Sequence, residues 1–166
     1  EEDYDEIFFV DASANGWAAI RVSNCRDKMV IYQQMWIHTL TNQLVKRETT
    51  EAVSQDEQHN VTFRHSAHAE PWAIRTMLQH ILRVEKDFGS KRIAIVTDHF
   101  AIPQAQRKQN NFGGIGRGFA LNSLYQVANN IPGCWFFYIK GLLNPADTFS
   151  RNFPPEMKLG KILITE

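Results

Sequence analysis

Four acidic residues give this sequence its clearest capacity for chemistry: Asp11, Glu70, Asp98 and Asp147. Each is expected where a strand ends or a helix begins. Asp11 follows the apolar run 7–10, and Asp98 comes one threonine after the apolar run 93–96. In an α/β sheet, ligands gather at the ends of neighbouring strands. If these two strands are neighbours, their carboxylates converge at one edge of the sheet.

A carboxylate cluster of this kind suits divalent metal ions. Hard cations such as Mg²⁺ prefer oxygen ligands to those of histidine or cysteine. Two such ions about 4 Å apart can activate a water molecule and neutralise the leaving oxygen in phosphodiester hydrolysis. Each acid also has a purely structural interpretation. Asp98 could cap a helix and Asp11 could form a turn. Glu70 and Asp147 could lie in the first turn of a helix, where negative charge is favourable.

The apolar pattern predicts the elements that must position these acids. Strands are expected at 7–10, 17–22, 29–36, 92–97 and 134–139, with a further short strand at 61–65. A long helix is expected from Ala69 to about Gly89, with Glu70 in its first turn, and another helix at 119–131. Asn144 and Pro145 are typical of the start of a third helix. This order predicts an α/β sandwich with a mixed sheet.

Length and composition suit one globular domain over residues 1–166. Its core is expected at about 7–151 and a C-terminal surface tail at 152–166. The polar segment 38–60 is expected to be a surface insertion rather than a binding element, and 110–118 a glycine-rich loop. The two cysteines form no C-x-x-C pair, so neither a structural zinc site nor a disulfide scaffold is expected.

The overall charge does not point to a partner, since 18 basic residues balance 18 acidic ones. Nucleic-acid binders are often basic, but local clusters of each sign matter more than the sum. No apolar run reaches about 18 residues, and the acidic N-terminus is unlike a signal peptide. We expect an intracellular protein, cytoplasmic or nuclear, that is neither secreted nor membrane-bound. The missing initiator methionine suggests a piece of a longer chain.

Four short sequence motifs (here called words) around the acids resemble those of retroelement ribonuclease H domains of the DIRS or Gypsy type. From Asp11 the chain has D-A-S-A-N-G-W-A, similar to the opening word D-A-S-x-x-G-W-A. Thr97, Asp98 and His99 look like the word T-D-H. Residues 139–151, I-K-G-L-L-N-P-A-D-T-F-S-R, look like the closing word of the family, and H-A-E-P-W-A around Glu70 lies where the family opens its long helix. The resemblance covers about residues 7–151.

The resemblance implies a ribonuclease H-like fold with a mixed five-stranded sheet flanked by helices. It implies endonucleolytic cleavage of the RNA strand of an RNA–DNA hybrid, by a domain that follows a reverse transcriptase in one polyprotein. Carried over position by position, the catalytic metal ligands are Asp11, Glu70, Asp98 and Asp147, which would hold two Mg²⁺ or Mn²⁺ ions. Asp11 would bridge both ions.

One departure from the family pattern concerns turnover. Many relatives have a histidine after the glycine of the closing word, where it is thought to assist product release, and this chain has Leu142. We interpret the change as slower turnover rather than loss of activity.

Substrate contacts are expected from two further groups of residues. Ser13 and Asn15 follow the first acid and could read the RNA 2′-hydroxyl, through which such hybrids are recognised. Arg107, Lys108 and Arg117 flank the glycine-rich loop and could hold DNA phosphates. Ordinary solvated surface charges are an equally good interpretation of these three cations.

Two rival functions compete with the nuclease. A catalytically quiet ribonuclease H-like domain would serve as a structural or tethering module, but all four carboxylates are present, which favours the enzyme. A transposase or integrase core would have a closing glutamate about 35 residues after the second aspartate; Gly133 lies there. The transposase interpretation is therefore disfavoured.

Overall fold

The computed structural model describes residues 4–23, 29–36, 66–107, 119–158 and 160–166. Its centre is a six-stranded mixed sheet in the order β5-β4-β1-β2-β3-β6. The strands are β1 (Glu6–Ala12), β2 (Gly16–Ser23), β3 (Met29–Met35), β4 (Arg92–Thr97), β5 (Gly133–Tyr138) and β6 (Leu163–Thr165). β1 to β3 form an antiparallel meander, β4 and β5 run parallel to β1, and β6 is antiparallel to β3. The α/β class and the mixed sheet are confirmed.

The number of strands differs from the expected five. β6 belongs to the segment 152–166, which was expected to be a surface tail, and it pairs with β3 through Leu163, Ile164 and Thr165. A three-residue edge strand is too short to show the period-two alternation by which strands are recognised. Its pairing partner, and not its own pattern, makes it a strand.

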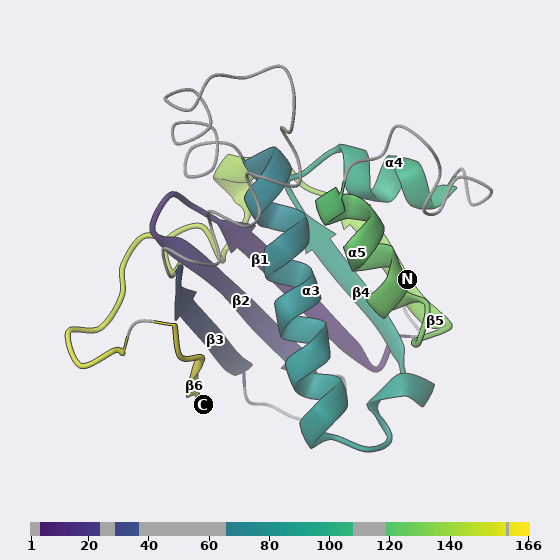
Figure 1. Ribbon diagram of the computed structural model, residues 1–166, viewed down its shortest axis with the longest axis horizontal. Helices are drawn as coiled ribbons and strands as arrows, with labels where there is room; N and C mark the ends of the chain where they lie inside the picture. The colour runs from purple at the N-terminus through teal and green to yellow at the C-terminus, as the bar shows by residue number, and fades with distance from the viewer. Residues whose placement is uncertain (1–3, 24–28, 37–65, 108–118, 159) are drawn as a thin grey trace.

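In the described part of the chain, three α-helices accompany the sheet: α3 (Ser66–Val84), α4 (Ala101–Arg107) and α5 (Phe119–Ala128). α3 and α5 pack side by side and cross one face of the sheet (Figure 1). α3 begins earlier than expected and ends at Val84, before the short 3-10 helix η1 (Phe88–Ser90) that contains Gly89. Glu70, expected in the first turn, is the fifth residue of the helix, and Pro71 lies inside it.

The expected helix at Asn144 is absent. The chain forms the 3-10 helix η3 (Gly141–Leu143) and then a series of turns up to Arg151. The Asn144 side chain does accept a hydrogen bond from the N–H of Ala146 at 3.0 Å, as a capping residue would. The turns that follow do not continue into a helix, because the segment is held against the sheet instead.

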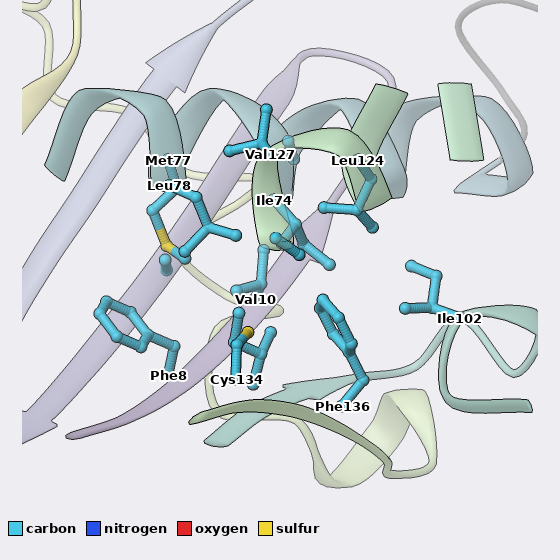
Figure 2. Packing of buried hydrophobic residues seen from close by; sticks show 14 of the residues in the cluster. Phe8, Val10, Ile74, Met77, Leu78, Ile102, Leu124, Val127, Cys134 and Phe136 are labelled. Carbon is cyan, nitrogen blue, oxygen red and sulfur yellow. The ribbon is translucent and has the colours of Figure 1, made fainter. Parts of the chain in front are cut away.

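A single apolar layer between the sheet and the two long helices holds the fold together (Figure 2). It includes Phe8 and Val10 from β1, Ile74, Met77 and Leu78 from α3, Leu124 and Val127 from α5, and Cys134 and Phe136 from β5. Each fully buried large aliphatic or aromatic side chain stabilises the folded state by roughly 1.5–3 kcal/mol. None of the described helices combines the length and the hydropathy needed to cross a membrane.

The outer edge of β5 is closed by a side chain. The buried amide of Gln106 in α4 donates to the carbonyl of Cys134 and accepts from the N–H of Phe136, both at 2.8 Å. This amide therefore pairs with two backbone groups that another strand could otherwise use. Covering an edge in this way discourages edge-to-edge association of sheets.

A buried ion-pair network closes the sheet at the start of β1. The Arg21 guanidinium donates to both oxygens of Glu6 at 3.0 Å and to both oxygens of Glu85 at 2.7 and 2.9 Å. Ser23 and Lys91 also donate to Glu6, at 2.6 and 2.9 Å. Burial acts to raise the pKa of Glu6, but these hydrogen bonds outweigh it and lower the pKa from 4.5 to about 2.

Glu6 should therefore make stability depend on acid pH. A lowered carboxylate pKa stabilises the folded state above the unfolded-state value and loses that contribution as the pH falls towards the folded-state value. The values of 4.5 and about 2 correspond to about 3 kcal/mol at neutral pH. We expect Glu6→Gln to reduce the free energy of unfolding by about this amount at pH 7, and by much less near pH 2.

The measurement is chemical denaturation of wild type and Glu6→Gln across this pH range. Glu156→Gln is the matched control, because Glu156 is exposed. A difference between wild type and Glu6→Gln that stays constant with pH would contradict the assigned role of Glu6.

Candidate metal centre

Two of the four acids are brought together by strand pairing. β1 and β4 are parallel neighbours whose register pairs Val10 with Thr97. Asp11 and Asp98 each follow this pair by one residue, so both lie at the same edge of the sheet. The condition under which the sequence predicts that these two carboxylates converge is therefore met.

The third acid comes from the helix above the sheet. Glu70 lies in the second turn of α3 and its side chain is fully buried. The hydroxyl of Thr97, the last residue of β4, donates to Oε2 of Glu70 at 2.7 Å. This bond fixes the orientation of the carboxylate over the ends of β1 and β4.

Asp11, Glu70 and Asp98 form one compact group. One carboxylate oxygen from each lies within 4.8 Å of the other two. Asp11 and Glu70 are buried and Asp98 is half-buried. No basic side chain hydrogen bonds to any of the three among the described residues.

The electrostatic consequence is that Asp11 and Glu70 resist ionisation. Burial raises the pKa of Asp11 from 3.8 to about 7; the hydrogen bond from Ser150 partly opposes this, and the charges of Asp98 and Asp147 add to it. Burial, and then the charge of Asp98, raises the pKa of Glu70 well above its ordinary value. Like charges placed together in a poorly solvated site disfavour the ionised form of each.

The residues present fit a hard divalent cation. Oε1 of Glu70 and Oδ1 of Asp98 are buried without a hydrogen-bond partner. Buried acceptors without a partner are rare in folded proteins and call for an explanation such as a bound ion. An all-carboxylate donor set is the one that Mg²⁺ and Mn²⁺ prefer. The group can therefore hold a metal ion that supplies the missing positive charge.

Hydrogen bonds hold the closing segment 141–151 against the end of β1 and against Asp11. The Asn144 amide donates to the carbonyl of Val10 at 2.9 Å, and the Ser150 hydroxyl donates to Oδ2 of Asp11 at 2.7 Å. Gly141 lies so close to Asp98 that a Cβ placed there would be 3.1 Å from Oδ2. A side chain at position 141 would force Asp98 to move.

Asp147 is near this group but not part of it. Its side chain is 37% exposed and accepts a hydrogen bond from Nε of Arg151 at 3.2 Å. Its charge contributes to the raised pKa of Asp11, so the two carboxylates influence each other. The structure thus brings three of the four expected ligands together and places the fourth at the exposed rim.

The expected substrate contacts have different surroundings. Ser13 donates to the carbonyl of Ser150 at 2.5 Å, so its hydroxyl is already used, whereas Asn15 is exposed. Arg107 is exposed at the end of α4. Lys108 and Arg117 lie outside the described residues, as do the insertion 38–60, the strand expected at 61–65 and the loop 110–118.

Sequence reasoning did not single out the residues that orient the acids. Thr97 and Ser150 are both buried and hold Glu70 and Asp11, and Asn144 anchors the closing segment. All three belong to words that were noticed for their aspartates. A signal was present in Thr97, next to Asp98, and in Ser150, three residues after Asp147, but only the structure shows which carboxylate each hydroxyl contacts.

Divalent metal ions should stabilise the folded protein through this group. At a metal concentration ten times the dissociation constant, the gain is about 1.4 kcal/mol, or roughly 3–6 °C in melting temperature for a domain of this size. Asp11→Asn should abolish the rise in Mg²⁺ and in Mn²⁺, whereas Asp87→Asn, an exposed control, should keep it. An equal response in the two variants would argue against the site. Calorimetry or thermal unfolding followed by circular dichroism measures the effect.

The same group predicts how pH acts without metal. The pKa of Asp11 is about 7 in the folded protein and 3.8 ordinarily, so metal-free wild type should lose stability as the pH rises between these values. Asp11→Asn should lose less. Because metal must displace the proton, the metal-induced rise in melting temperature should be larger at pH 8 than at pH 6. A response that does not change with pH would contradict the raised pKa.

Comparison with solved structures finds similarity to, among others, the prototype foamy virus protease-reverse transcriptase. The similarity covers 91% of this chain, with a TM-score of 0.48 and 10% sequence identity, and this chain spans 21% of the length of that one. No protein-family model matches the sequence, and no curated protein does either. The fold therefore rests on this chain's own strand order and contacts.

Proposed function

We propose that this domain is a ribonuclease H, an endonuclease that cleaves the RNA strand of RNA–DNA hybrids with two divalent metal ions. The observation that carries the proposal is the convergence of Asp11, Glu70 and Asp98 within 4.8 Å, with two buried oxygens left without partners. The mixed sheet agrees with the ribonuclease H-like fold that the sequence words imply. A meander of three antiparallel strands is followed by two strands parallel to β1.

In this proposal Asp11, Glu70, Asp98 and Asp147 hold the ions. Bound Mg²⁺ or Mn²⁺ would activate the attacking water and neutralise charge on the leaving oxygen. Thr97 and Ser150 keep the Glu70 and Asp11 carboxylates in fixed orientations, so little reorganisation is needed when substrate binds.

Asp147 is suited to be a metal ligand that coordinates the ion from the solvent side. Its hydrogen bond to Arg151 is exposed, and exposed ion pairs are worth only about 0–1 kcal/mol. Exchanging Arg151 for a metal ion therefore costs little. In this proposal Asp11 and Glu70 are buried ligands with fixed orientations, and Asp147 is a partly exposed ligand whose side chain can adjust.

Recognition of RNA is assigned to the turn that follows Asp11. Asn15 is exposed on this turn, and its amide can donate to or accept from a 2′-hydroxyl. Ser13 has its hydroxyl engaged with Ser150 and acts by shaping the turn. Arg107, with Lys108 and Arg117, is proposed to contact the DNA strand.

The proposed partners follow from the sequence words. A reverse transcriptase domain of the same polyprotein would produce the hybrid, and the ribonuclease would remove its RNA strand inside the cell. The quiet structural module remains the competing function.

Hybrid cleavage tests the proposal directly. The purified chain, incubated with labelled substrates in Mg²⁺ or Mn²⁺, should cut the RNA strand of a hybrid and leave duplex DNA of the same sequence intact. Asp98→Asn should remove activity both at enzyme excess and in the steady state, because it takes away a metal ligand, whereas Asp87→Asn should keep it. Equal cutting of hybrid and duplex DNA would indicate a general nuclease. No cleavage by wild type, even at enzyme excess in Mn²⁺, would favour the quiet module.

Leu142 should limit the rate of turnover. It is 98% exposed and follows Gly141, the residue that lies against Asp98. Groups that move protons typically contribute about 10²–10⁴-fold to rates. A histidine at 142 can approach the product phosphate, so Leu142→His should raise steady-state turnover and leave single-turnover cleavage nearly unchanged.

Leu143→His is the matched control, since Leu143 is the neighbouring exposed leucine, at 68%. Its steady-state rate should stay close to that of wild type. The assigned role of position 142 fails if both histidine variants behave alike.

A further inference from the structure

A second site on the molecule has the chemistry of an anion-binding groove. One wall is the outer side of α3, with Thr76, Gln79, His80 and Arg83. The other wall is Gln34 from β3 and the C-terminal segment 160–162, which includes Lys161. We call this hollow the α3–tail groove. Its volume of about 380 Å³ is large enough for a phosphate group with an attached sugar.

The α3–tail groove has a rigid frame. The Trp17 indole N–H donates to Oε1 of Gln34 at 2.7 Å, and the Gln34 amide donates to the carbonyl of Gly160 at 2.9 Å. Trp17 is fully buried, so it anchors Gln34 in one rotamer. Gly160 has a positive φ of 79°, a conformation in which glycine is favoured. The C-terminal segment is thereby held in place opposite α3.

The polar groups of the groove are mainly donors. Arg83 and Lys161 are exposed cations, and none of the described residues that line the groove is acidic. A terminal nitrogen of Arg83 lies 3.3 Å from Nδ1 of His80. Because arginine only donates, Nδ1 accepts and the neutral ring carries its hydrogen on Nε2. His80 therefore holds Arg83 and offers a further donor.

The carboxylate nearest to Arg83 along the chain is already paired with another cation. Glu85, the nearest acid along the chain beyond Arg83, is engaged by the Arg21 guanidinium through two hydrogen bonds. The Thr76 hydroxyl is also engaged, since it donates to the carbonyl of Trp72. Two cations, an imidazole N–H and the Gln79 amide thus remain for a ligand. This combination of charge and donors matches the oxygens of a phosphate.

We propose that the α3–tail groove binds phosphate groups, and that its ligand is the sugar–phosphate backbone of a polynucleotide bound at the metal centre. The second part rests on the proposed function; the first does not. Arg83 comes thirteen residues after Glu70 on α3, which corresponds to a rise of about 20 Å along the helix axis. At about 3.4 Å per nucleotide, a strand must extend roughly six nucleotides beyond the metal centre to reach the groove.

The first experiment uses inorganic phosphate as the probe. Amide chemical shifts of Gln34, Gln79 and Gly160 should change on titration of wild type, and should not change in Arg83→Gln/Lys161→Gln. The control is Lys86→Gln/Lys158→Gln, which removes the same charge from two exposed lysines that do not line the groove. It should respond like wild type. Absence of groove shifts in wild type, or equal shifts in the groove variant, overturns the phosphate assignment.

The second experiment separates a polynucleotide from a free phosphate. Binding of RNA–DNA hybrids of about 6 and about 16 base pairs is measured in an Asp98→Asn background with Mg²⁺, to prevent cleavage. The groove variant should weaken binding of the long hybrid by about threefold to tenfold and make the salt dependence shallower by about one to two phosphate contacts. The short hybrid and the control variant should be unaffected.

The outcomes distinguish the two proposals. Phosphate shifts without any effect on long-hybrid binding would keep a phosphate site and overturn the polynucleotide as its ligand. If the groove and control variants weaken binding of the long hybrid equally, the effect is one of nonspecific charge, and the polynucleotide is again overturned as the ligand of the groove. If wild type cleaves the hybrid but shows no amide chemical-shift changes with phosphate, the proposed nuclease function is kept and the phosphate assignment of the groove is overturned.

Discussion

The parallel pairing of β1 with β4 is the constraint on which the rest of the structure depends. It buries Phe8, Val10 and Ile95 beneath α3, and its register places Asp11 and Asp98 side by side at the strand ends. The hydrophobic core cannot form in this register without bringing the two carboxylates together. α3, packed on the same core, then adds Glu70 to them. The candidate metal centre is thus a direct consequence of how the core is built.

The buried acids at the two ends of β1 have pKa values shifted in opposite directions. Glu6 at the start receives hydrogen bonds from Arg21, Ser23 and Lys91, which lower its pKa to about 2. Asp11 at the end receives one from Ser150, and burial with other carboxylates around it raises its pKa to about 7. An acid matched by basic side chains serves stability. A group of acids without such a match is suited to a cation from solution, and this contrast singles out the C-terminal ends of β1 and β4 as the candidate site.

Much of this arrangement could be predicted from the sequence because its signals are local. The continuous apolar run in β4 and the aspartate after it pointed to the strand and to a candidate ligand, and the strand bounds 92–97 agree with the structure. β6 could not be predicted, since it depends on pairing with β3 and not on its own pattern. The same holds for Thr97 and Ser150, whose hydroxyls meet Glu70 and Asp11 from 27 and 139 residues away. Contacts between distant residues leave no periodicity to read.

The zero net charge of the chain becomes intelligible once its acids are placed. Asp11, Glu70 and Asp98 lie together at the ends of β1 and β4, with Asp147 nearby, and bound divalent ions would neutralise the four acids. The 18 basic residues of the chain would then face 14 remaining acidic ones, and the excess positive charge would be felt by a polyanion approaching the surface. In the α3–tail groove this excess is local, because Arg83 and Lys161 have no acidic neighbour among the described lining residues. Under the proposed function, the chain can therefore be neutral overall and still attract nucleic acid when its ions are bound.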